Sequence, residues 1–133
     1  MRFEHFALNV ADAPAVASWY VENCFMEMVF SSAKEPFMHF MADSTGRVVM
    51  ELYTNRRAAI PDYRNQDPLI FHFALQVEDP VKEQNRLLQA GATIVEEVRL
   101  PDSSLLIMMR DPWGLALQLC KRAVPFNTGD GKA

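Results

Sequence analysis

The sequence contains little cysteine, histidine or positive charge, and it has no long apolar run. Two cysteines among 133 residues make no disulfide framework, so a reducing compartment, the cytoplasm, is expected. Thirteen Lys and Arg against seventeen Asp and Glu give a net charge of −4, which disfavours a nucleic-acid partner. No apolar stretch approaches the roughly 20 residues of a membrane span, and the first residues lack the basic region and cleavage site of a signal peptide. We therefore expect neither a nucleic-acid nor a membrane partner.

The remaining composition is that of an ordinary globular domain. Half of the residues are hydrophobic and 23% are charged, which argues against disordered and fibrous classes. The length is typical of one compact domain that can bury a sizeable core.

An internal repeat divides the chain. The segment HFALNVAD at residues 5–12 returns as HFALQVED at residues 72–79, with six of eight positions identical and an offset of 67. The matched positions include a histidine and an aspartate in each copy. We infer a duplicated module.

The same succession of elements follows each copy. Asp12 and Asp79 each precede a helical pattern, where the carboxylate can cap the free N–H groups of the first turn. Apolar runs, separated by the turns DSTG and DPWG, then predict three strands per copy. The runs are residues 26–30, 37–42 and 48–53 in the first copy and residues 93–98, 105–109 and 115–120 in the second. Both halves therefore indicate a βαβββ module and an α+β protein.

These boundaries predict one domain over residues 1–124. It consists of module one (1–54), a linker (55–69) and module two (70–124), followed by a flexible tail at 125–133. The linker carries three arginines that could meet an anionic substrate, and we interpret them as solvated loop charges instead. They are Arg56, Arg57 and Arg64.

Two equivalent pairs of polar residues fall on the strand face opposite the core. Strand alternation places His5, Glu51, His72 and Gln118 there. His5 and His72 are 67 residues apart, as are Glu51 and Gln118. If the modules pack with approximate two-fold symmetry, both pairs can meet and hold a divalent metal such as Zn, Ni, Co, Fe or Mn.

In these features the chain resembles the vicinal oxygen chelate superfamily over about residues 1–122. Its members include glyoxalase I, methylmalonyl-CoA epimerase, extradiol dioxygenases, and fosfomycin and bleomycin resistance proteins. The resemblance implies two tandem βαβββ modules that form a curved, incomplete barrel around a central cavity. It places His5, Glu51, His72 and Gln118 at metal-ligand positions, and DPWG at 111–114 where the family often has DPDG. It also implies a homodimer, with each metal site either within one chain or shared between module one of one subunit and module two of its partner.

The leading hypothesis is a metal-dependent, glyoxalase-like lyase or isomerase that acts on a small oxygen-chelating substrate. The metal would stabilise an enediolate, and Glu51, the one carboxylate of the set, would be the base that removes the proton. Glutamate is the commoner family residue where this chain has Gln118. The amide removes a second base, which favours a glyoxalase-type reaction over epimerisation.

Two other functions use the same residues or the same fold. His5, His72 and Glu51 have the composition of a non-haem Fe(II) site, as in extradiol dioxygenases, although the family carboxylate then stands at the position of Gln118. A non-catalytic small-molecule-binding or resistance protein would instead use an apolar cavity. The aromatic residues considered for that cavity are Trp19, Tyr20 and Trp113.

Two further residues are interpreted as structural. His39 lies in a central apolar run and is expected in the core or a cavity wall, and the pattern leaves its face open. Cys120 lies two residues from Gln118 and is interpreted as an inert small hydrophobe rather than a metal ligand.

Overall fold

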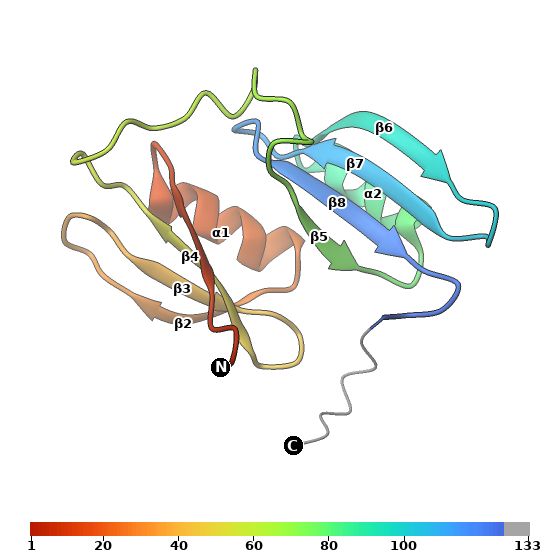
Figure 1. The fold of residues 1–133 in the computed structure, drawn as a ribbon. Coiled ribbons are helices and arrows are strands. Elements are labelled where there is room, and N and C mark those ends of the chain that lie inside the picture. Colours follow the sequence, from red (N-terminus) through yellow and green to blue (C-terminus); the bar gives the residue numbers. More distant parts are fainter. Residues whose placement is uncertain (127–133) are drawn as a thin grey trace. The chain divides into compact units, whose positions relative to one another are not determined.

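The chain folds into two units, each with one helix and one four-stranded sheet. The computed structural model describes residues 1–126, so most of the predicted tail at 125–133 lies outside the described residues. The first unit is Met1–Pro61 and the second begins at Asp62, inside the predicted linker. Each sheet is open, and the α+β class with its repeated order of elements is confirmed (Figure 1).

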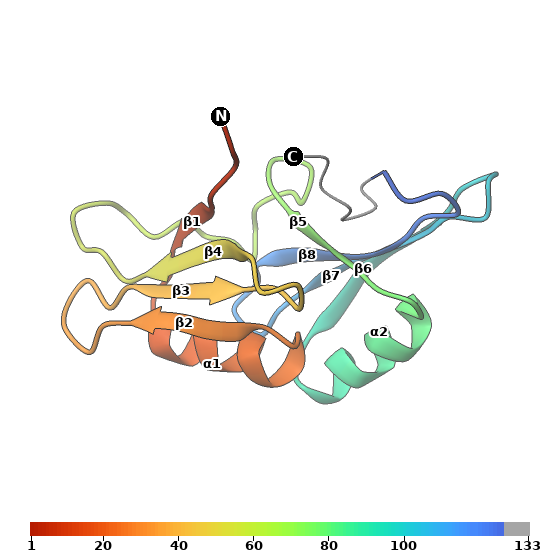
Figure 2. The same cartoon turned by 90° about the horizontal axis from the view of Figure 1, so that it is seen from below.

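In unit 1 the helix covers one face of the sheet, as Figure 2 shows. The sheet order is β1-β4-β3-β2, with β1 parallel to β4 and the other neighbours antiparallel. The elements are β1 (Phe6–Asn9), α1 (Ala13–Asn23), β2 (Glu27–Ser31), β3 (His39–Ala42) and β4 (Val48–Tyr53).

Unit 2 repeats this topology. Its sheet order is β5-β8-β7-β6, again with the first strand parallel to the last. The elements are β5 (Phe73–Gln76), α2 (Pro80–Gln89), β6 (Thr93–Arg99), β7 (Leu105–Arg110) and β8 (Ala116–Lys121).

Both helices begin at the predicted aspartates. The Asp12 carboxylate accepts a hydrogen bond from the backbone N–H of Ala15 at 3.1 Å, and the Asp79 carboxylate accepts one from Lys82 at 3.0 Å. Such caps satisfy N–H groups that have no partner within the helix, and each contributes about 1 kcal/mol. No helix within residues 1–126 is long and apolar enough to cross a membrane.

Strand alternation separates the core of unit 1 from the candidate site. In β4, Met50 and Leu52 are fully buried on the side that faces α1, whereas Glu51 between them is only partly buried. Truncation of such a side chain, for example Leu52→Ala, costs about 2–5 kcal/mol. The fully buried residues of α1 are Ala13, Val16, Ala17 and Tyr20.

The two sheets share one register at the positions that matter for the site. Ala7 of β1 lies opposite Glu51 of β4, and Ala74 of β5 lies opposite Gln118 of β8. The 67-residue offset of the sequence is therefore also a structural equivalence.

A bulge in unit 1 maintains this register. The β3–β4 ladder pairs Met41 with Met50 and then Ala42 with Val48, so β4 has one extra residue. The β7–β8 ladder runs from Met109–Leu117 to Arg110–Ala116 without such a shift. A β-bulge accommodates one extra residue in one strand, and the pairing of the residues beyond it is unchanged.

Candidate functional site

His5 and Glu51, two of the four predicted ligands, are in contact. His5 lies just before β1, and Glu51 lies in the neighbouring strand β4. The His5 Nε2 atom is 3.1 Å from Glu51 Oε2, with 28% and 13% of the respective side chains exposed. Both side chains lie on the sheet face opposite α1, because they alternate with the buried residues of their strands.

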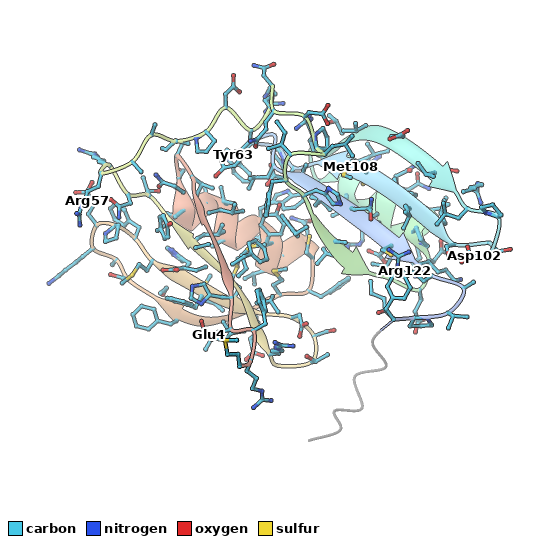
Figure 3. The ribbon with its side chains drawn as sticks, in the orientation of Figure 1. Glu4, Arg57, Tyr63, Asp102, Met108 and Arg122 are labelled. Carbon is cyan, nitrogen blue, oxygen red and sulfur yellow. The ribbon has the colours of Figure 1, made fainter. Side chains whose placement is uncertain are left out.

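Glu4 is a further site residue that the sequence analysis missed. Its carboxylate contacts His5 Nδ1, so both ring nitrogens of His5 face a carboxylate. Figure 3 labels Glu4 at the N-terminal end of β1. The repeat gave no signal for it, because the residue before His72 is Phe71. A carboxylate on Nδ1 fixes the ring and leaves Nε2 as the nitrogen that faces the site.

The ring of His72, like that of His5, has a partner at Nδ1, but the partner is a backbone carbonyl instead of a carboxylate. Its Nδ1 is 2.8 Å from the backbone carbonyl oxygen of Pro68. A carbonyl only accepts, so Nδ1 carries the hydrogen and Nε2 keeps its lone pair. His72 is two residues before Ala74, which lies opposite Gln118, so the His72–Gln118 pair occupies positions equivalent to those of His5 and Glu51.

The donor atoms of the two pairs fit a divalent ion. Two imidazole nitrogens, one carboxylate and one amide oxygen are ligands of divalent transition metals. Two atoms bound to one such ion, at about 2.1 Å each, lie about 3 Å apart, which is close to the His5–Glu51 separation of 3.1 Å. Within residues 1–126 no cluster of three or more His, Cys, Asp or Glu side chains forms a metal site. The predicted set has three such residues, and they are divided between the two units.

Aromatic rings extend the His5–Glu51 face across the sheet of unit 1. Phe40 of β3 lies opposite Glu51 and packs edge-on against the His5 ring, with centroids 5.3 Å apart. Phe30 of β2 packs against Phe40 at 6.1 Å and is 50% exposed. The polar pair therefore adjoins an exposed aromatic surface.

The equivalent row of unit 2 is more polar. Gln118 lies opposite Met108 of β7, and Met108 lies opposite Glu96 of β6 (Figure 3 labels Met108). The two units thus differ in the residues around their paired ligand positions.

The linker arginines do not gather at the site. Arg56 pairs with Glu35 at 2.9 Å, and Arg57 is exposed on the loop after β4 (Figure 3). Arg64 donates to the backbone oxygen of Pro112 at 2.6 Å, within the DPWG turn. Arg64 therefore stabilises a turn, a role that the sequence interpretation of solvated charges did not include.

Cys120 and His39 have distinct surroundings. Cys120 is buried in β8 opposite Gln76, and it lines a cavity of about 180 Å³ together with Gln76 and Arg122 (Figure 3 labels Arg122). His39 lies opposite the buried Leu52, which places it on the side of the sheet that carries α1. The structure thereby resolves the face that the sequence left open.

The three aromatic residues considered for an apolar cavity lie in different surroundings. Trp19 and Tyr20 are buried on α1 and pack edge-on at 5.0 Å, so they belong to the core of unit 1. Trp113 is partly buried in the β7–β8 turn, where its backbone N–H donates to Asp111 Oδ1 at 2.9 Å.

Comparison with known proteins decides the family. The family model of the Glyoxalase/Bleomycin resistance protein/Dioxygenase superfamily matches residues 2–119. The chain belongs to this superfamily. Members of the superfamily bind small molecules. No curated protein matches the sequence.

Solved structures of the superfamily share the fold at low sequence identity. A glyoxalase-related enzyme from Fulvimarina pelagi is 19% identical, with a TM-score of 0.70 over 96% of this chain and 94% of that chain. Lactoylglutathione lyase from Agrobacterium tumefaciens is 19% identical, with a TM-score of 0.66 over 90% and 92%. TnmS3, an antibiotic binding protein from Streptomyces sp. CB03234, is 17% identical, with a TM-score of 0.67 over 90% and 94%. This fold therefore occurs both in enzymes and in binding proteins.

Proposed function

We propose that the protein is a metal-dependent lyase or isomerase of the glyoxalase type. In this proposal His5, Glu51, His72 and Gln118 hold one divalent ion, and the substrate is a small molecule with two neighbouring oxygens. The observation that carries the proposal is the 3.1 Å contact between His5 Nε2 and Glu51 Oε2. It brings a metal-binding nitrogen and a potential base together on the face opposite the core.

Glu51 is the residue that moves the proton. When bound, a divalent ion supplies a Lewis acid for the two substrate oxygens. The Glu51 carboxylate is 13% exposed and lies beside Phe40, so little water competes for it. It takes a proton from the carbon beside the carbonyl and returns it to the adjacent carbon. The Gln118 amide exchanges no proton at neutral pH, so the set has one base and favours a glyoxalase-type reaction over epimerisation.

Two neighbouring groups orient the imidazoles. The Glu4 carboxylate contacts His5 Nδ1, and the Pro68 carbonyl accepts from His72 Nδ1 at 2.8 Å. Each contact fixes the orientation of its ring and leaves Nε2 as the nitrogen available to a metal ion. These partners support a metal-binding role over two histidines that serve only packing.

The test compares Glu51→Gln with the wild type in metal content and in isomerisation of a hemithioacetal. The amide keeps an oxygen ligand, so we expect bound metal to be retained and kcat to fall by about 10²–10⁴-fold, the usual contribution of a general base. Glu22→Gln, an exposed position on α1, is the matched control and should retain full activity. An active Glu51→Gln enzyme would rule out the proposed role. Oxygen uptake with catechols after anaerobic Fe(II) loading would instead assign these residues to extradiol chemistry.

A non-catalytic binding protein is the second candidate. The exposed aromatic surface of Phe30 and Phe40 favours it, because flat apolar ligands stack on such rings. Removal of all metal with a chelator separates the two functions. A binding protein would keep its affinity for an aromatic ligand after this treatment, whereas the proposed enzyme would lose activity.

A further inference from the structure

A second cleft opens in unit 1 on the side of the sheet that carries α1. Its volume is about 360 Å³, within the range of small-molecule sites. It lies on the opposite face from His5 and Glu51, because its residue His39 pairs with the core residue Leu52. The cleft is lined by Pro14, Ser31, Ser32, Ala33, Phe37 and His39.

The polar centre of this cleft is the ring of His39. The side chain is buried, with the residue 7% exposed, and its Nδ1 is 2.6 Å from the carbonyl oxygen of Phe37. Nδ1 therefore carries the hydrogen, and Nε2 is an acceptor. Nε2 has no hydrogen-bond partner among the described residues. Every fully buried side-chain nitrogen or oxygen of the described part has a partner, so Nε2 retains exposed surface, and His39 lines the cleft.

The rest of the lining determines the charge of a suitable ligand. None of the six lining residues carries an ionised carboxylate, ammonium or guanidinium group. The start of α1 offers no free donor to an anion, because the N–H of Ala13 is bonded to Thr54 and that of Ala15 to Asp12, and Pro14 has none. These features disfavour anionic and cationic ligands.

The apolar and hydroxyl groups of the cleft determine the shape of the ligand. Pro14, Ala33 and Phe37 provide apolar surface for a small body. Ser31 is the cross-strand partner of His39, so its hydroxyl lies on the same face as the imidazole. A ligand that bonds to Nε2 thus has a second polar group nearby.

We propose that this cleft binds a small neutral molecule that combines an apolar body with one hydrogen-bond donor, such as a phenol. The hydroxyl donates to His39 Nε2, and the ring packs on Phe37 and Pro14. This site is independent of the proposed metal site, because the two lie on opposite faces of the unit 1 sheet.

The test is a titration of the full chain with phenol, followed by NMR of ¹⁵N-labelled histidine and of backbone amides. We expect millimolar phenol to shift the Nε2 resonance of His39 and the amides of residues 31–33, with the His5 and His72 resonances unchanged. Toluene has the same ring without the donor and should bind about tenfold more weakly, the difference made by one hydrogen bond.

Two variants control for shape. Ala33→Leu fills the cleft without touching the bond between His39 and Phe37, and it should weaken phenol binding at least tenfold. Ala59→Leu, an exposed position on the loop after β4, should have no effect. Equal binding of phenol and toluene, unchanged binding to Ala33→Leu, or shifts centred on His5 would each overturn the proposal.

Discussion

His5 is the residue whose surroundings say most about the chemistry of the protein. One carboxylate contacts each of its ring nitrogens, Glu4 at Nδ1 and Glu51 at Nε2. The two contacts differ in role, because a metal ion bound at Nε2 would leave the contact between Nδ1 and Glu4 in place. The hydrogen on Nδ1 would stay with Glu4 and keep the ring in place.

Replacement of Glu4 by glutamine should therefore weaken metal binding without removing a ligand. We expect the affinity to fall by about 10–100-fold, as for other groups that orient a metal-binding histidine. Competition with a chromophoric chelator measures this change, and Glu22→Gln on α1 is the control. Unchanged affinity would show that Glu4, which is 69% exposed, is only a surface charge.

At the level of single residues, the sequence predicted paired positions but not every partner. The repeat and the alternation placed His5 and Glu51 on the same strand face, and the structure shows their side chains in contact. They did not identify Glu4, because module two has no equivalent acidic residue. The face of His39 was also open, because Phe37 just before it has a positive φ of 54° and interrupts the alternation of the strand.

At the level of elements, the loop before β5 is organised by side chains of unit 2. Arg110 of β7 donates to the carbonyl oxygens of Tyr63 and Gln66, both at 2.8 Å. Gly114, at a φ of 95°, lies so close to this loop that a Cβ atom would be 2.6 Å from the Cα of Arg64. Strand and helix patterns do not reveal such contacts, because a side chain here bonds to backbone carbonyls far away in the sequence.

Arg110 should consequently act on the metal site through the loop. The loop also contains Pro68, whose carbonyl orients His72. We expect Arg110→Met to reduce metal affinity by about tenfold, since the Pro68 carbonyl is no longer held in place. Isothermal titration measures the affinity, and circular dichroism checks that the fold is retained. Arg99→Met removes an exposed arginine of β6 and should leave metal binding unchanged. Equal losses in both variants would argue against a positioning role.

At the level of the whole molecule, the protein is two copies of one unit, each with half of the predicted ligands. Element order, sheet order and register all repeat. The sequence predicted this organisation well, because six identical residues at an offset of 67 are a strong signal. The repeat also made Glu51 and Gln118 equivalent. It did not predict that their cross-strand neighbours differ, Phe40 beside Glu51 and Met108 beside Gln118.

The proposal that His5, Glu51, His72 and Gln118 hold one divalent ion predicts one bound ion per chain. We expect metal analysis to give this ratio for the wild type, and His5→Ala and His72→Ala each to lose the ion. More than one ion per chain, or full retention in either variant, would contradict the proposal.

If the protein is a homodimer, as the resemblance implies, a mixture of the two variants tells where the site lies. If module one of one subunit pairs with module two of its partner, mixed dimers regain one intact site. If both modules of a site come from one chain, the mixture stays inactive. Unfolding and refolding the variants together, followed by metal analysis, distinguishes the two arrangements.

The bulge in β4 has a consequence for how such a protein changes over time. Met41 corresponds to Met109, 68 residues later, whereas Met50 corresponds to Leu117, 67 residues later. The extra residue of unit 1 lies in the bulge, so the offset between the two units is again 67 at Glu51 and Gln118. Insertions and deletions in this hairpin can thus accumulate in one half of a duplicated gene product while the paired positions stay in phase.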